Sequence, residues 1–136
     1  MESWRIAFRD GLAPLLTLKG LVCLATALEA DDPQVEQGCT TLPVVGDCGG
    51  YFDNWPCQGA CPLAFALWHG EGLDTVTDVQ EAYLRVCQQA GERLGDLEAV
   101  GAFVRWCDET ERANMRRLLL IEAEGAIVDR RLPLAG

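Results

Sequence analysis

Four cysteines lie within one stretch of 23 residues, in the sequence GCTTLPVVGDCGGYFDNWPCQGACP. Glycine and proline recur in this stretch, and no sustained helical or alternating pattern of apolar residues runs through it. Thiolates bind soft metal ions, exchange disulfides and act as nucleophiles, so this loop is the part of the chain most suited to chemistry. The four residues are Cys39, Cys48, Cys57 and Cys61.

The spacing of these cysteines, C-x8-C-x8-C-x3-C, differs from that of common metal sites. Structural zinc sites combine two close pairs, because a short turn presents two thiolates to one ion. Iron–sulfur clusters use similarly close spacings. Only Cys57 and Cys61 are close here. We therefore predict no cofactor, and we keep as the alternative a zinc site or a thiol-redox response that uses Cys39, Cys48, Cys57 and Cys61.

Cys61 is the strongest candidate for a reactive thiol. Pro62 disfavours helical geometry at the residue before it and suits the first turn of a helix, so Cys61 is expected at the start of a helix over 60–69. The helix dipole and the free N–H groups of the first turn stabilise a thiolate and lower its pKa. The charges of Asp47 and Asp53 act in the opposite direction.

His69 is the only histidine, so any cysteine–histidine chemistry must use it. It follows Cys61 by eight residues in the same predicted helix, which separates the two by about 12 Å. A nucleophile and its base must lie within hydrogen-bond reach, so a Cys61–His69 pair is not expected. A contact of His69 with Cys39 or Cys48 remains open, and so does a plain helix-end position.

Three aromatic residues, Tyr51, Phe52 and Trp55, lie in the cysteine loop. Large aromatic side chains bury much apolar surface, so we expect them to pack the loop onto the helices. The alternative is an exposed patch that binds a partner protein, since Tyr and Trp are favoured at interfaces.

The segments around the loop have the apolar periodicity and the capping residues of α-helices. Thr17, Thr75 and Thr110 are suited to begin helices, and Gly95 is suited to end one. The apolar run over 118–128 indicates that the last helix is the central one. Helices are predicted over 18–30, 60–69, 76–93, 97–107 and 111–130, with a short lead-in over 4–12 and a short helix over 33–38.

The remaining cysteines, Cys23, Cys87 and Cys107, lie on or beside apolar helix faces, where free cysteine packs as a small hydrophobe. Glu122 or Glu124, which interrupt the apolar run of the last helix, is expected to be partly buried and paired with arginine. Arginines of the same helix are expected to pair with the acidic middle of the chain, within one chain or across a dimer. They are Arg112, Arg116 and Arg117.

These patterns predict an all-α fold. We expect residues 1–136 to form a single domain, a bundle of four or five helices with one long irregular loop over about 39–60. A chain of 136 residues that is 49% hydrophobic can bury a core without disulfide bonds or a structural metal ion.

The charge of the chain excludes some partners. The net charge is −10, and residues 21–100 carry 13 acidic side chains against 2 basic ones. Such a surface repels phosphate groups, so we expect neither nucleic-acid binding nor binding to anionic membranes. The apolar run over 12–28 resembles an export signal, but Lys19 interrupts it and Glu2 and Asp10 precede it. We expect an amphipathic helix there and a cytoplasmic location with reduced thiols.

The sequence shows no catalytic machinery. Glycine-rich segments lack the lysine and the helix of a phosphate-binding loop, and no Glu-x-x-His pair indicates a di-iron site. We therefore expect a small acidic protein that binds a protein partner or a second copy of itself. An enzyme whose site the sequence does not reveal is a further alternative to the metal or thiol-redox hypothesis.

Overall fold

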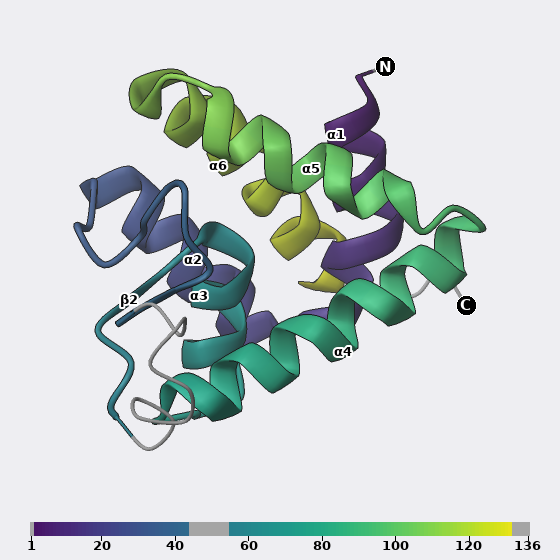
Figure 1. Ribbon diagram of the computed structural model, residues 1–136. Helices are drawn as coiled ribbons and strands as arrows, with labels where there is room; N and C mark the ends of the chain where they lie inside the picture. The colour runs from purple at the N-terminus through teal and green to yellow at the C-terminus, as the bar shows by residue number, and fades with distance from the viewer. Residues whose placement is uncertain (1, 44–54, 132–136) are drawn as a thin grey trace.

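The structure, a computed structural model, describes residues 2–43 and 55–131. These residues are mostly helical, which confirms the all-α prediction (Figure 1). A four-residue helix and two irregular helical turns come first, and five longer helices follow. In order, the elements are α1 (Ser3–Ile6), the π-helical η1 (Ala7–Leu12), the 3-10 turn η2 (Ala13–Leu15), α2 (Leu18–Ala30), β1 (Thr41–Leu42), β2 (Gly59–Ala60), α3 (Pro62–Gly70), α4 (Val76–Leu94), α5 (Glu98–Glu109) and α6 (Arg112–Arg131).

Thr17, Thr75 and Gly95 begin or end helices where the sequence predicts, whereas Thr110 is the C-cap of α5 and α6 begins at Arg112. The Thr17 hydroxyl accepts a hydrogen bond from the Gly20 N–H at 2.9 Å and begins α2. The Thr75 hydroxyl accepts from the Asp78 N–H at 3.2 Å and begins α4. Gly95 ends α4 with a left-handed φ of 68°. Each threonine cap contributes about 1 kcal/mol.

The segment after α2 differs from the prediction, because no helix forms over 33–38. The Asp32 carboxylate accepts the Gln34 N–H at 2.9 Å in a tight turn. The chain then runs beside β2, where Glu36 N–H donates to the Ala60 carbonyl and Ala60 N–H donates to the Gln34 carbonyl. The short β1–β2 pair was also not expected from the sequence. Tertiary pairing outweighs the local preference for a helical turn here.

α3 is the central helix, and the prediction of a central last helix is wrong. Every residue of α3 from Pro62 to Trp68 is buried, because α2, α4 and β2 surround it. α6 instead packs one face on α2 and leaves the other in solvent, with Ile121 57% exposed. An apolar run is therefore a poor guide to which helix is buried on all sides.

α2 and α3 approach each other closely at two glycines. A Cβ on Gly20 would lie 2.5 Å from the Ala66 carbonyl oxygen, and a Cβ on Gly70 would lie 2.8 Å from the Gly20 Cα. Neither position can hold a side chain without moving the backbone. The absence of side chains at Gly20 and Gly70 therefore sets the distance between the two helices.

Arginine contacts join the ends of the chain. Arg9 donates to both carboxylate oxygens of the buried Glu122, and Arg5 pairs with the same carboxylate at 3.4 Å. Glu122 is therefore the partly buried, arginine-paired glutamate that the sequence predicts, whereas Glu124 is exposed. Arg130 Nη2 donates to three carbonyls around η2 at 2.6–2.9 Å.

Arg112 and Arg116 fasten the end of α2 to the start of α6. Both pair with the Asp31 carboxylate, at 2.8 and 3.5 Å, so the predicted pairing with the acidic middle region occurs within one chain for these two residues. Arg117 donates to the Asn114 side chain instead. Within residues 2–43 and 55–131, no helix combines the length and the hydropathy needed to cross a membrane.

Candidate functional site

The described cysteines of the loop are held in separate surroundings. Cys39 is half-buried after the turn that follows Val35, and Cys57 is buried and donates its thiol to the Gly59 carbonyl at 3.4 Å. Cys61 is buried at the start of α3. Cys48 lies outside the described residues, as do Tyr51 and Phe52.

The described thiols do not form a metal centre by themselves. Among residues 2–43 and 55–131, no three His, Cys, Asp or Glu side chains are grouped so that they could hold a metal ion. A zinc site of Cys39, Cys48, Cys57 and Cys61 would need three described ligands together with Cys48. The structure does not bring the three described residues of this set together.

Cys61 lies at the N-terminus of α3, as predicted. The pKa of its thiol is raised, however, whereas the sequence predicts that it is lowered. Its side chain is closed off by surrounding groups, and this burial raises the pKa of the Cys61 thiol to about 12. The N–H groups of Leu63 and Ala64 act in the other direction. Dipole stabilisation at a helix end amounts to about 1 kcal/mol, whereas full burial shifts a pKa by up to about 3–5 units. The reactivity of Cys61 itself stays a prediction.

Two further cysteines lie near Cys61 in the core. Cys107 of α5 and Cys87 of α4 pack in the same region of the core, where the Tyr83 side chain lies beside Cys87. Burial raises the pKa of both thiols and of the Tyr83 hydroxyl. These groups are therefore kept neutral at physiological pH, as expected for structural cysteines.

Trp55 is the described member of the aromatic set proposed to pack the loop or bind a partner. Its side chain is 45% exposed, while its backbone carbonyl accepts the Val76 N–H at 2.9 Å. Pro56 pairs with Thr75 beside it. The backbone around Trp55 is thus anchored to the start of α4, and its ring keeps a large solvent-exposed area.

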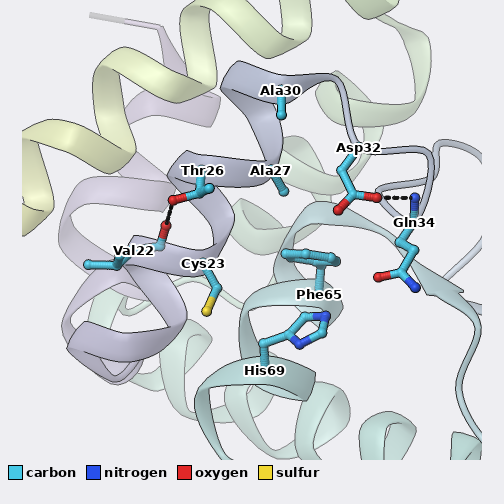
Figure 2. Close-up of a pocket in the computed structure, with 9 residues that line it drawn as sticks. All are labelled: Val22, Cys23, Thr26, Ala27, Ala30, Asp32, Gln34, Phe65 and His69. Atoms are coloured by element: carbon cyan, nitrogen blue, oxygen red, sulfur yellow. Dashed lines mark hydrogen bonds between the residues drawn. The ribbon is translucent and has the colours of Figure 1, made fainter.

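A pocket of about 290 Å³ lies between α2 and α3. Figure 2 shows Phe65 and His69, one turn apart on α3, facing side chains of α2 and of the turn after it. Small and apolar side chains make up most of its wall, and Asp32 contributes a carboxylate. The residues that line it are Val22, Cys23, Thr26, Ala27, Ala30, Asp32, Gln34, Phe65 and His69.

His69 is held among aromatic rings at the floor of this pocket. Its ring centroid lies 4.4 Å from that of Phe65 and 4.3 Å from that of Trp68. Its Nε2 atom is buried and has no hydrogen-bond partner in the part of the chain that the structure describes. Burial lowers the pKa of His69 below 6.5; the nearby Lys19 charge also lowers it, and the Asp32 charge raises it. The imidazole is therefore neutral at pH 7.

The structure gathers residues that the sequence did not connect. The sequence offers His69 as a partner for Cys39 or Cys48 or as a plain helix-end residue, and in the structure it shares a pocket with Cys23 and Asp32. No signal in the sequence shows this, because the close approach of α2 and α3 at Gly20 and Gly70 is visible only in the structure. Cys23 lies one turn after Gly20 and His69 directly precedes Gly70, so the two residues face the same gap.

Comparison with known proteins adds no assignment. No protein family, curated protein or solved structure gives a significant match to this chain. The case for function therefore depends on the surfaces and sites described above.

Proposed function

We propose that this protein is a non-catalytic, self-associating module and that the exposed face of α6 is its dimer contact. The observation that supports this best is an exposed stripe on α6 that is complementary to itself in antiparallel orientation. The stripe consists of Asn114, Arg117, Ile121, Glu124, Gly125 and Val128, all exposed.

The stripe contains two large apolar side chains with little protein around them. Ile121 is 57% exposed and Val128 is 54% exposed, and they lie two helical turns apart on one face. The opposite face of α6, which includes Met115 and Leu119, is buried against the rest of the protein. α6 therefore exposes two apolar side chains that the intramolecular core does not use.

Charge complementarity favours a second copy as the occupant. If two α6 helices cross in antiparallel orientation at Ile121, each Arg117 faces Gly125 of the other copy and lies beside its Glu124. The two Ile121 side chains meet at the centre, flanked by two equivalent arginine–glutamate contacts. A two-fold contact requires this kind of self-complementary surface.

Gly125 also fits this arrangement. A Cβ at Gly125 would meet no atom within 4 Å, so packing inside one chain does not require glycine. Glycine within a helix costs about 1 kcal/mol relative to alanine. In the proposed dimer, the lack of a side chain at Gly125 leaves space for Arg117 of the second copy.

The expected association is weak. α6 has 20 residues and is therefore about 30 Å long. A contact limited to one such helix from each copy is at the small end of specific interfaces, below about 1,200 Å² of total buried area. We expect reversible dimers in the micromolar to millimolar range.

Sedimentation equilibrium over a range of concentrations tests this proposal. We expect the wild-type mass to rise toward that of a dimer, and Ile121→Asp to remain monomeric. Leu84→Asp is the matched control, because Leu84 is 65% exposed on α4, away from the stripe. A wild-type protein that is still monomeric at about 1 mM would contradict the proposal. A binding free energy of only about −4 kcal/mol corresponds to a dissociation constant of about 1 mM, so even a dimer that weak would be detectable at this concentration.

A charge exchange sharpens the test. Arg117→Glu places like charges across the proposed contact and is expected to weaken the dimer, and Glu124→Arg is expected to do the same. The double variant restores opposite charges in exchanged positions and should recover the association. Failure of the double variant to recover, with both single variants folded, would exclude the antiparallel arrangement.

A further inference from the structure

We propose that the pocket between α2 and α3 is a binding site for a small organic amine, with Asp32 holding the ammonium group and Phe65 contacting the apolar body. This site is independent of the α6 stripe, because none of the residues that line it belongs to α6.

The shape of the pocket suits a small ligand with an apolar body. Its volume of about 290 Å³ is close to the lower limit for ligand sites, which is about 300 Å³. Ala27 and Ala30 provide apolar surface from α2, and the Phe65 ring provides a flat surface below them (Figure 2); Val22 also lines the pocket. A mostly apolar pocket with a few polar groups is the usual composition of a ligand site.

Asp32 supplies a carboxylate that the protein does not neutralise. One of its oxygens accepts the Gln34 N–H, and none of the ion pairs within residues 2–43 and 55–131 includes Asp32. The nearby Arg112 pairs with Asp31 and donates to the carbonyl groups of Asp32 and Val35 instead. The Asp32 carboxylate thus remains available to a cation at the pocket.

The other polar groups of the pocket favour a cation over an anion. His69 is neutral at pH 7, so no residue that lines the pocket brings a positive charge that would attract a carboxylate or phosphate; the Lys19 charge acts on His69 but Lys19 does not line the pocket. The Thr26 hydroxyl donates to the Val22 carbonyl and is already engaged. The net charge of −10 attracts cations further. An ammonium group beside an aromatic ring also gains cation–π attraction.

Benzylamine is a suitable probe, because it combines an ammonium group with one aromatic ring. Trp68 stacks on His69 at the pocket floor, so tryptophan fluorescence offers a readout, with isothermal titration calorimetry as the second measurement. We expect a dissociation constant in the millimolar range, typical of a ligand this small. Benzyl alcohol and benzoate serve as the neutral and anionic comparisons, and both are expected to bind at least about tenfold more weakly.

Variants locate the site. Asp32→Asn keeps an oxygen that can accept the Gln34 N–H but removes the charge, so it should fold and bind benzylamine about tenfold more weakly. Glu29→Gln makes the same charge change at a nearby residue that does not line the pocket, and it should bind normally. Ala30→Leu places a larger side chain at an exposed helical position of the pocket wall and should reduce binding sharply.

Cys23 provides a further readout that does not depend on fluorescence. Its thiol lines the pocket, so bound benzylamine is expected to slow its alkylation by iodoacetamide, and benzoate is expected to have no effect. Equal binding of benzylamine and benzyl alcohol, unchanged binding by Asp32→Asn, or no benzylamine binding at all would each overturn the proposal. Charge-dependent binding lost in Asp32→Asn and kept in Glu29→Gln would support it.

Discussion

The two ends of α3 place ionisable groups in contrasting surroundings. At the N-terminal end Cys61 is buried near Cys87 of α4 and Cys107 of α5, and at the C-terminal end His69 borders an open pocket against α2. Burial raises the pKa of the thiol and lowers the pKa of the imidazole. Both shifts have one cause, since burial disfavours whichever form carries a charge. The difference is access: a ligand reaches the pocket at His69, whereas Cys61 is covered.

The largest expected effect concerns thiol chemistry. Raising the pKa of Cys61 from 9.0 to about 12 lowers the thiolate fraction near neutral pH about a thousandfold. We expect iodoacetamide, followed by peptide mass spectrometry, to label the half-buried Cys23 well before Cys61. Faster labelling of Cys61 than of Cys23 would reverse the comparison and restore the prediction of an activated Cys61.

The second largest effect concerns the contact between α2 and α3 at Gly20, beside the pocket that contains His69. Gly20→Ala places a Cβ 2.5 Å from a backbone oxygen of α3, so α2 must move, and we expect a loss of about 2–3 kcal/mol in unfolding free energy. Urea denaturation measures this. Gly101→Ala is the matched control, since its Cβ would meet only the end of the Arg105 side chain at 3.4 Å; it should stabilise by up to about 1 kcal/mol. Equal effects of the two substitutions would show that the close approach is unimportant.

A third prediction concerns the loss of stability at alkaline pH that burial of Cys61 at the N-terminal end of α3 should cause. Above about pH 9 the unfolded chain releases the Cys61 proton while the folded protein keeps it, because the folded pKa is about 12. Stability is therefore lost as the pH rises, at about 1.4 kcal/mol per unit from this thiol, with Cys107 and Tyr83 adding in the same direction. Urea unfolding at about pH 8 and about pH 10 measures the slope. It should be shallower in Cys61→Ser, and an unchanged slope would contradict the burial argument.

The smallest expected effect is the loss of stability at acidic pH that is caused by His69, at the C-terminal end of α3. Because the pKa of His69 is lowered in the folded protein, the unfolded chain takes up a proton first as the pH falls below about 6.5, and stability decreases. The expected loss is under about 1 kcal/mol, since the ring is only half-buried and solvent screens it. Thermal unfolding at about pH 7.5 and about pH 5.5 would reveal it, and His69→Gln should remove that part of the change. A larger loss in His69→Gln than in the wild type would contradict the assignment.

Local signals in the sequence predicted the helices well. Thr17, Thr75 and Gly95 act through hydrogen bonds and backbone angles within a few residues, so their effects can be read without knowing the fold. The expected helix over 33–38 failed because Val35 pairs with Ala60, a partner 25 residues away. Long-range pairing of that kind leaves no local trace.

The candidate sites were harder to predict for the same reason. Pro62 places Cys61 at the start of α3, but the pKa of its thiol is set by the core around it, and residues of that core come from distant parts of the sequence. The pocket of His69, Cys23 and Asp32 joins residues from two helices and a turn. Their proximity depends on Gly20 meeting Gly70, and two glycines 50 residues apart carry no obvious signal of contact.

The arginine contacts between the chain ends have a consequence for folding kinetics. Arg9 meets Glu122 across 113 residues, and Arg130 donates to the Leu16 carbonyl across 114. The N-terminal turns therefore obtain these partners only after the residues up to Arg130 have been synthesised. Contacts of such large sequence separation raise the contact order and slow folding relative to helical proteins with mainly local contacts. The contacts of η1 and η2 with α6 are thus expected to form late in folding.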